Sequence, residues 1–470
     1  MIGAVADFDL QSILDTFGPN AAVDYARHLN PRFVDLLRLT GFDRRFVRGE
    51  GPYLFDEDGT RYLDCIAGYA SVALGRDHPT VRSALEQVLS LGVPSFVQWE
   101  TSPLAVALAT GLKEFIDRND DQVFFVNSGT EGVEAAIKFA RAATGRPGLL
   151  HCENAFHGLT MGALSMNGSA WLRRGFGPFM PGVREVPFGR VAEVAEALAD
   201  RQVAAFVFEP IQGKGVRIPP PGWLREVAEI CRRTGTLLIA DEVQTGLGRT
   251  GSRLRCMVED VDPDIVVVSK VLSAGVAPVG AVLARPSIME RVFNSVDRSV
   301  VHSSTFREGP LALAAGLAAL QVLRDEDLIA NVRRQGQSLI SRLEALADEV
   351  PGISAVRGVG LMIGVELDAD ALTRALPGIG GFRDTLVAQG MVIRMLADHR
   401  ILAQSTSRGS AVVKLVPPFV IDEGDVDWIV DAFRNTLQTM AGGKVADLRG
   451  LASMVRNAGD VVLRELVRGG

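Results

Sequence analysis

The stretch Asp264-Ile-Val-Val-Val-Ser-Lys270-Val-Leu-Ser-Ala274 places a lysine at the end of an apolar run. Burial disfavours an ammonium group, so a lysine in this position loses its proton more easily than one in water. The neutral amine is a nucleophile and forms a Schiff base with a carbonyl compound. We therefore interpret Lys270 as a reactive amine rather than as a residue that serves structure alone.

Carboxylates end two further apolar runs, Thr236-Leu-Leu-Ile-Ala-Asp241 and Phe206-Val-Phe-Glu209. In open α/β folds ligands bind at the carboxyl edge of the sheet, so we expect Asp241 and Glu209 to converge there. Pyridoxal phosphate requires a lysine for its aldehyde and an acid for its pyridine nitrogen. Lys270 and Asp241 therefore predict a site for this cofactor.

Short apolar runs alternate with helical stretches from about residue 100 to residue 325, which predicts an α/β fold with a mostly parallel sheet between helices. We expect strands at residues 123–126, 149–151, 204–208, 236–240, 265–268 and 280–284. A chain of 470 residues exceeds a single simple core. The expected parts are an N-terminal helical segment (1–45), a large cofactor-binding domain (101–325), a smaller α+β domain built from 46–100 and 326–440, and a tail (441–470).

Further elements are expected in the smaller domain. An Asp-Gly pair at residues 58 and 59 predicts a β-hairpin. A long helix is expected at residues 326–345, and strands are expected near 360–367, 391–394 and 412–416. The tail is expected to be helical.

Composition excludes several classes of function. A net charge of -7 gives no support to binding of nucleic acid or of an anionic membrane. The four cysteines are scattered and lack metal-ligand spacing, which predicts reduced thiols, no metal site and a cytoplasmic protein. The first residues lack a basic region, which argues against a signal peptide, and no apolar run reaches the length of a membrane span.

Two motifs offer groups that could hold the cofactor. Asn127-Ser128-Gly129-Thr130-Glu131 follows a strand and opens a helix, whose unpaired N–H groups and dipole favour an anion. The pair Ser128 and Glu131 also fits a capping box. Phe156, in Asn154-Ala-Phe-His-Gly158, could stack on a flat ring. Taken alone, the first motif also fits an ordinary capped helix. In the second motif, Phe156 alone also fits a core aromatic, and His157 fits a loop histidine whose hydrogen bonds are satisfied.

The segment Gly246-Leu-Gly-Arg-Thr-Gly251 matches the G-x-G-x-x-G pattern of nicotinamide dehydrogenases. We disfavour that alternative because no clear helix opens after Gly251. In addition, Asp241-Glu-Val-Gln244 intervenes between the strand and the glycines.

Asp241-Glu-Val-Gln-Thr-Gly-Leu-Gly-Arg-Thr-Gly251, followed by Ser269-Lys270, resembles the signature of class III pyridoxal-phosphate aminotransferases. The resemblance spans roughly residues 30–440 and includes Asn127-Ser-Gly-Thr-Glu, Ala155-Phe-His-Gly, Phe208-Glu-Pro-Ile-Gln-Gly and His302-Ser-Ser-Thr-Phe in the family's order. Within the family the chain looks closest to putrescine and other diamine aminotransferases. The resemblance implies fold type I and a homodimer with shared active sites.

The resemblance also assigns roles to individual residues. Lys270 would bind the cofactor and move the substrate's proton, and Asp241 would pair with the pyridine nitrogen. The remaining implied cofactor contacts are Ser128, Gly129 and Thr130 at the phosphate, Phe156 on the ring, Gln244 near the ring hydroxyl, and Thr305 at the phosphate of the other subunit. Glu209, Tyr69, Trp99 and Lys414 would line the substrate side, with dimer-interface core as the alternative for the two aromatics.

The chain departs from the family pattern in three places. Many members that act on α-amino acids carry an arginine where this chain has Lys414, and lysine cannot make the planar fork that clamps a carboxylate. We therefore expect a donor that lacks an α-carboxylate, a diamine or another ω-amine, with a 2-oxo acid as acceptor. The pair Arg307-Glu308 replaces small residues after Thr305, so Arg307 either adds to phosphate binding or faces solvent. The loop after Lys270 is bulkier than in relatives.

Two other classes of function remain open at this stage. A mutase, racemase or lyase could use the same scaffold, because the motifs determine the cofactor and not the fate of the reaction. A cofactor-less interaction protein that kept the fold is disfavoured by the intact set of Asp241, Gln244 and Lys270.

Overall fold

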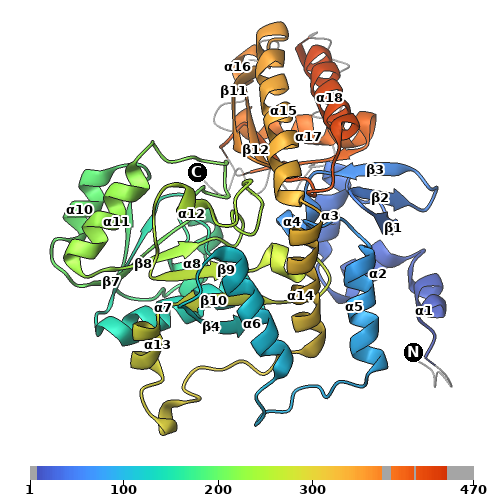
Figure 1. Ribbon diagram of the computed structural model, residues 1–470. Helices are drawn as coiled ribbons and strands as arrows, with labels where there is room; N and C mark the ends of the chain where they lie inside the picture. Colours follow the sequence, from blue (N-terminus) through green and yellow to red (C-terminus); the bar gives the residue numbers. More distant parts are fainter. Residues whose placement is uncertain (1–7, 373–382, 407–408, 442–470) are drawn as a thin grey trace.

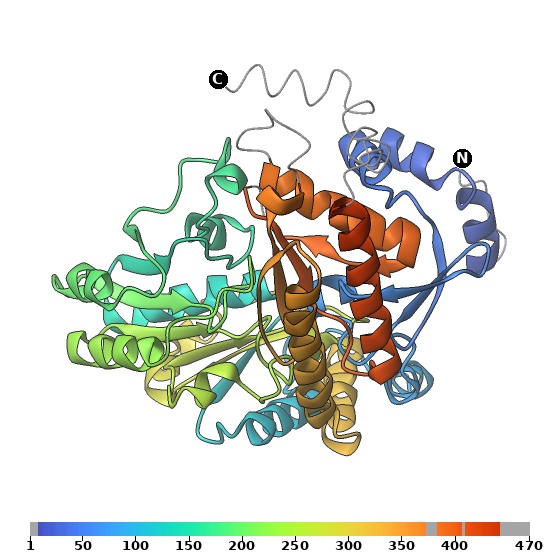
Figure 2. The same ribbon diagram turned by 90° about the horizontal axis from the view of Figure 1, so that it is seen from above.

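The computed structural model describes residues 8–372, 383–406 and 409–441, so the expected helical tail lies outside the described residues. Three helices open the described chain, as expected for the N-terminal segment: α1 (Leu10–Phe17), α2 (Ala21–His28) and α3 (Pro31–Thr40). Asn30 caps α3 by accepting hydrogen bonds from the backbone N–H groups of Arg32 and Phe33, and Pro31 fits the first turn. Figure 2 shows these helices on the opposite side of the molecule from α10 (Val191–Leu198) and α11 (Trp223–Thr234).

A seven-stranded sheet in the order β4-β10-β9-β8-β7-β5-β6 forms the centre of the large domain. Its strands are β4 (Gln122–Val126), β5 (Gly148–Cys152), β6 (Val183–Val186), β7 (Val203–Phe208), β8 (Leu237–Asp241), β9 (Ile265–Val268) and β10 (Gly280–Ala284). Strands β5 to β9 are parallel to one another, whereas β10 is antiparallel to β4 and β9. The predicted mostly parallel sheet is confirmed, and β6 is a strand that the sequence reasoning missed.

Buried side chains on both faces of this sheet explain why its strands are apolar throughout. In β9, Val266 and Val268 join one hydrophobic cluster, and Ile265 and Val267 join another. The first cluster includes residues of α10 and α11, and the second includes residues of α7 (Gly129–Thr144) and α13 (Pro286–Val292). Figure 1 shows these two pairs of helices on opposite sides of the sheet.

The second part of the molecule contains two four-stranded sheets. One has the order β1-β2-β3-β13 and the other β11-β12-β15-β14. The predicted hairpin is confirmed, because β2 and β3 pair in antiparallel fashion. The strands are β1 (Phe46–Glu50), β2 (Tyr53–Asp56), β3 (Arg61–Asp64), β11 (Ile353–Val359), β12 (Met362–Leu367), β13 (Ile401–Leu402), β14 (Gln404–Ser405) and β15 (Val412–Leu415).

One expected strand is wrong. Residues 391–394 lie inside helix α17 (Arg383–His399), where Val387, Met391 and Met395 are buried at helical spacing. A short apolar run fits a buried helix as well as a strand, and only its longer context separates the two. The expected long helix is α15 (Leu328–Glu349), which follows α14 (Pro310–Asp325).

The remaining helices connect these parts. They are α4 (Ala67–Ala70), α5 (Pro79–Ser90), α6 (Pro103–Ile116), α8 (Met161–Ser165), α9 (Ala170–Arg173), α12 (Arg255–Val258), α16 (Ala369–Leu372), α18 (Glu423–Ala441), and the 3₁₀ turns η1 (Lys270–Ser273) and η2 (Val296–Arg298). Among the described residues, no helix is both long enough and apolar enough to cross a membrane.

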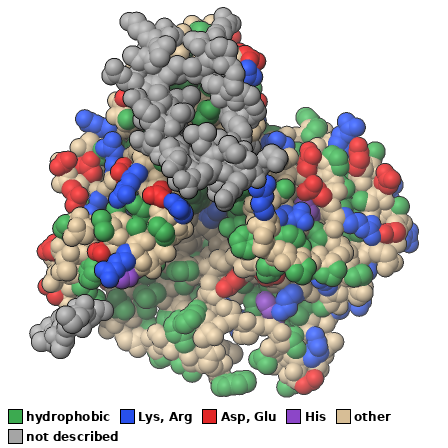
Figure 3. Space-filling view, turned by 180° about the vertical axis from the view of Figure 1, so that it is seen from behind, with side chains coloured by type: hydrophobic (Ala, Val, Ile, Leu, Met, Phe, Trp, Pro, Cys, Tyr) green, Lys and Arg blue, Asp and Glu red, His purple; other side chains and the backbone are tan. Residues whose placement is uncertain are grey.

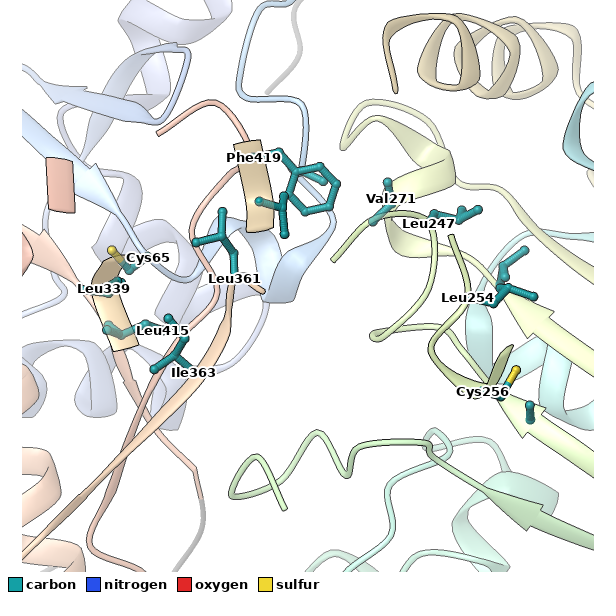
Figure 4. Packing of buried hydrophobic residues seen from close by; sticks show 14 of the residues in the cluster. Cys65, Leu247, Leu254, Cys256, Val271, Leu339, Leu361, Ile363, Leu415 and Phe419 are labelled. Atoms are coloured by element: carbon teal, nitrogen blue, oxygen red, sulfur yellow. The ribbon is translucent and has the colours of Figure 1, made fainter. Parts of the chain in front are cut away.

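A continuous hydrophobic cluster joins the large sheet to the C-terminal elements. In Figure 4, Phe419 and Leu361 lie across from Val271 and Leu247. All four side chains are almost fully buried. Because Val271 directly follows Lys270, this packing holds the turn that carries the lysine.

A substitution at Gly132 tests how closely α7 packs on the sheet. A Cβ atom added there would lie 2.5 Å from Cγ1 of the buried Val267. We expect Gly132→Ala to lower the free energy of unfolding by about 1–3 kcal/mol, the usual cost of overpacking. The matched control is Gly111→Ala in α6, where the added Cβ lies 3.7 Å from Leu320. That change should raise stability by about 0.5–1 kcal/mol. Urea unfolding measures both, and an unaltered Gly132→Ala protein would contradict the packing described.

Candidate active site

Lys270 stands just beyond the carboxyl end of β9, at the first residue of η1. Its backbone has φ 34°, a left-handed conformation that costs a non-glycine residue roughly 1–3 kcal/mol. Ser273 Oγ donates to the Lys270 carbonyl at 2.6 Å, and Ser269 Oγ donates to Val279 O at 2.9 Å, so the turn is tied on both sides. Burial lowers the pKa of Lys270 to about 8, against the opposing charges of Asp241 and Glu209.

Asp241 ends the adjacent strand β8 and is buried. Its Oδ2 lies 2.8 Å from Nδ1 of His157, and its Oδ1 accepts the Val243 N–H at 3.1 Å. Burial lowers the pKa of His157, but the hydrogen bond and charge of Asp241 outweigh it and raise the pKa overall. The carboxylate is therefore held in place by a buried imidazole.

His157 is a site residue that the sequence reasoning missed. Its Nε2 is buried and finds no hydrogen-bond partner among the described residues. The available signal was positional, because His157 follows β5 and Asp241 ends β8, and both strands end at the same edge of one sheet.

The N-terminus of α7 forms an anion cradle. Ser128 caps the helix by accepting the Glu131 N–H at 3.3 Å, while Glu131 Oε2 accepts the N–H of Asn127 at 2.8 Å. Within the described chain, the N–H groups of Gly129 and Thr130 meet no acceptor. These free donors and the helix dipole suit a phosphate.

The cradle and the Asp241 loop are adjacent. A Cβ atom added to Gly129 would lie 2.7 Å from a methyl group of Val243, two residues after Asp241. The structure thus joins a nucleophilic amine, a carboxylate bonded to a buried histidine, and an anion cradle. This set fits pyridoxal phosphate, since it meets the aldehyde, the ring nitrogen and the phosphate of that molecule with one group each.

Glu209 lies just beyond β7 and is buried. Its two oxygens accept the N–H groups of Phe156 at 2.9 Å and Gly213 at 2.7 Å. Burial raises the pKa of Glu209, with His157 and the two N–H donors opposing and Asp241 adding to the rise. The side chain of Phe156 stays partly exposed beside this carboxylate.

Lys414 on β15 extends into the same region and is only 4% exposed. Its Nζ donates to Gly213 O at 2.7 Å and to Gln244 Oε1 at 2.5 Å, while Gln244 Nε2 donates to Tyr69 O at 3.3 Å. Burial, followed by the charge of Lys270, lowers the pKa of Lys414 to about 7. Lys414 and Gln244 thus lie together, a contact that the sequence reasoning did not predict.

Three predicted site residues are exposed rather than enclosed. The exposed fractions are 66% for Tyr69 and 90% for Trp99, and Thr305 is also exposed. Ser304 accepts a hydrogen bond from Asn127 Nδ2 at 2.8 Å, which places the segment of Thr305 beside the start of α7. Arg307 pairs with Glu308 at 2.5 Å and lies over the Phe124 ring.

The glycine-rich segment after Gln244 has a structural use. Arg249 is fully buried, and its guanidinium donates to the carbonyl oxygens of Leu361 and Pro417. Gly248 lies against Phe419, where an added Cβ would approach to 3.1 Å. The segment therefore joins the two parts of the molecule instead of opening a long helix, which removes the main support for a dinucleotide site.

Comparisons with known proteins agree with this geometry. The family described as Aminotransferase class-III matches residues 41–437. Aminotransferase PigE of Serratia sp. (strain ATCC 39006) is 37% identical over 87% of this chain, which spans 52% of that relative, about half its length. Ornithine aminotransferase 1 of Staphylococcus aureus (strain COL) is 37% identical over 83% of this chain and 94% of its own.

Solved structures show the same likeness. The ornithine aminotransferase from Toxoplasma gondii ME49 has a TM-score of 0.77 and 32% identity, covering 85% of this chain and 92% of its own. An omega transaminase engineered for synthesis of bulky amines has a TM-score of 0.78 and 27% identity, covering 86% of this chain and 96% of its own.

The low pKa of Lys270 predicts how fast pyridoxal phosphate attaches to the cofactor-free protein. The neutral amine is the reactive form, so the rate should rise with pH and reach half its maximum near pH 8. Stopped-flow absorbance measures the rate, with Lys270→Ala as the control that blocks attachment. A midpoint near the ordinary lysine value of about 10.4 would contradict the described burial.

Proposed function

The chain belongs to the class III aminotransferases, and we propose that it moves the amino group of a terminal amine lacking an α-carboxylate to a 2-oxo acid. The reverse transfer onto an aldehyde follows from the same site. The observation that carries this proposal is Lys414, which stands in place of an arginine and is bound to Gly213 and Gln244.

The family is pyridoxal-phosphate dependent, and this cofactor supplies an aldehyde and a ring that accepts electrons from the substrate carbon. In our proposal Lys270 binds the cofactor covalently, and its freed amine then takes the α-proton of the donor. A lysine with a pKa near 8 suits proton transfer at neutral to mildly alkaline pH. Asp241 would hold the proton on the ring nitrogen, and His157 orients Asp241 through the hydrogen bond between them.

The phosphate is proposed to bind the free N–H groups of Gly129 and Thr130. Ser128 orders that helix end through its cap, and Phe156 packs on the ring. Gln244 approaches the ring hydroxyl, with its amide orientation set by Lys414 and the Tyr69 carbonyl.

Lys414 is poorly suited to clamp an α-carboxylate. Such a clamp uses two parallel N–H donors in one plane, which an ammonium group lacks. Two of the three possible ammonium donors of Lys414 already bind Gly213 and Gln244. These facts support a donor without an α-carboxylate.

We further propose that the enzyme works as a homodimer in which Thr305 reaches the phosphate of the other subunit. Large hydrophobic side chains are exposed near the site and in its flanking segments, among them Tyr69, Trp99, Val296, Val301 and Phe306. Figure 3 shows a face with hydrophobic side chains on both sides of a central recess. Burial of such a surface against a second copy would remove it from water.

A single-turnover reaction separates transamination from a racemase, mutase or lyase reaction. With donor and no acceptor, an aminotransferase forms one equivalent of aldehyde per site and stops until a 2-oxo acid is added. Chromatography of the quenched reaction measures this stoichiometry. Continued turnover without an acceptor would support one of the other reactions.

The choice of donor tests the role of Lys414. We expect kcat/KM with 2-oxoglutarate as acceptor to be at least about tenfold higher for butylamine than for alanine or ornithine, as one missing charged contact commonly costs that much. Lys414→Arg should reduce this preference for butylamine, because arginine restores two parallel N–H donors for an α-carboxylate. Better use of alanine or ornithine than of butylamine by the parent enzyme would overturn the proposed donor class.

Asp241→Asn tests the proposed role of the carboxylate. The amide cannot hold a proton on the ring nitrogen, so we expect kcat to fall at least about 10²-fold with little change in fold. Asp264→Asn is the matched control, because Asp264 precedes the amino end of β9, a strand length away from Lys270. Steady-state kinetics and circular dichroism measure both variants. Equal loss of kcat in the two would argue against a specific role for Asp241.

A further inference from the structure

We propose that Lys214 and Lys414 together exclude a second positive charge from the donor's tail, so that the donor is a monoamine with a neutral tail rather than a diamine or ornithine. This inference rests on the proposed function and narrows its donor class. It depends on two lysines held on either side of Gly213, one of which has no assigned role.

Lys214 belongs to the loop that follows β7 and begins at Glu209. Its Nζ lies 5.1 Å from the centroid of the Phe156 ring, a cation–π arrangement that places the charge beside this ring. The side chain is partly exposed, so its ammonium remains accessible to a ligand. Within the described chain, no carboxylate oxygen lies within 4 Å of this ammonium.

Lys414 approaches the same loop from β15. Its Nζ donates to the carbonyl of Gly213, the residue that precedes Lys214. After burial, the positive charge of Lys270 is the next largest cause that lowers the pKa of Lys414, so the two lysines lie near each other. The donor's tail would therefore extend from Lys270 into a region that two further lysines flank.

The nearby acids are already engaged. Both oxygens of Glu209 accept backbone N–H groups, from Phe156 and Gly213, and this carboxylate also attracts the charges of Lys214 and Lys414. Asp241 is bound to His157. A second ammonium on the donor would meet Lys214 and Lys414, whose charges Glu209 already attracts, and like charges repel strongly in a partly buried site.

Close contacts hold the backbone of the loop that carries Lys214. A Cβ atom added at Gly213 would lie 2.6 Å from Gln244 Oε1, so the loop packs closely on the residue that Lys414 binds. Arg357 donates to the carbonyl oxygens of Gly215 and Val216, which fixes the other end of the loop. These contacts hold the backbone on both sides of Lys214.

The test compares two donors of equal chain length, pentylamine and pentane-1,5-diamine, with pyruvate as acceptor. For the parent enzyme we expect kcat/KM to be about 10- to 100-fold higher for pentylamine. Lys214→Glu should shift the ratio of the two kcat/KM values at least about tenfold toward the diamine, chiefly through KM, because the repulsion weakens binding. Lys214→Met, which removes the charge without reversing it, should give an intermediate shift.

Lys113→Met is the matched control, because Lys113 lies on α6 and donates to Asn119 O. It should leave the ratio unchanged. A parent enzyme that prefers the diamine, or an unshifted ratio in both Lys214 variants, would overturn this inference. If neither amine is a donor while ornithine is, the proposed function itself fails.

Discussion

The site depends on the removal of the Lys270 amine from water at the carboxyl edge of the central sheet. Strand β9 is buried on both faces and passes through the core. It ends at the carboxyl edge of the sheet, where Lys270 lies in a strained turn. Val271 is packed against the C-terminal elements through the shared hydrophobic cluster, which prevents this turn from relaxing into solvent. The same burial lowers the pKa of Lys270 and makes it a nucleophile.

Other charged groups at this edge are arranged around that amine. Asp241 is bonded to a buried histidine, whereas Glu209 is held by two backbone N–H groups. The lysines Lys214 and Lys414 lie on the proposed substrate side, where burial lowers their pKa values and the charge of Glu209 opposes that change. Asp241 and its histidine thus lie on a side that suits the cofactor ring. The other side, with Glu209 and the two lysines, is the one that we propose selects the donor by its charge.

The sequence predicted the large sheet well because its strands are short, continuous apolar runs bounded by helices, and six of its seven strands were expected. The prediction missed β6, because Arg184 and Glu185 interrupt its apolar pattern. It also wrongly assigned a strand to residues 391–394, an apolar run that lies in a helix. The bond between Lys414 and Gln244 could not be predicted, because it joins residues 170 positions apart. His157 was within reach of sequence reasoning only if its strand was known to lie in the same sheet as β8.

Reduction of the loaded enzyme with borohydride tests the central claim, that Lys270 is the residue that carries pyridoxal phosphate. Reduction makes the bond between lysine and cofactor permanent, and peptide mass spectrometry then identifies the modified residue. The account predicts one phosphopyridoxyl group per chain, on the peptide that contains Lys270. Modification of Lys214 or Lys414 instead, or an unmodified protein, would contradict it.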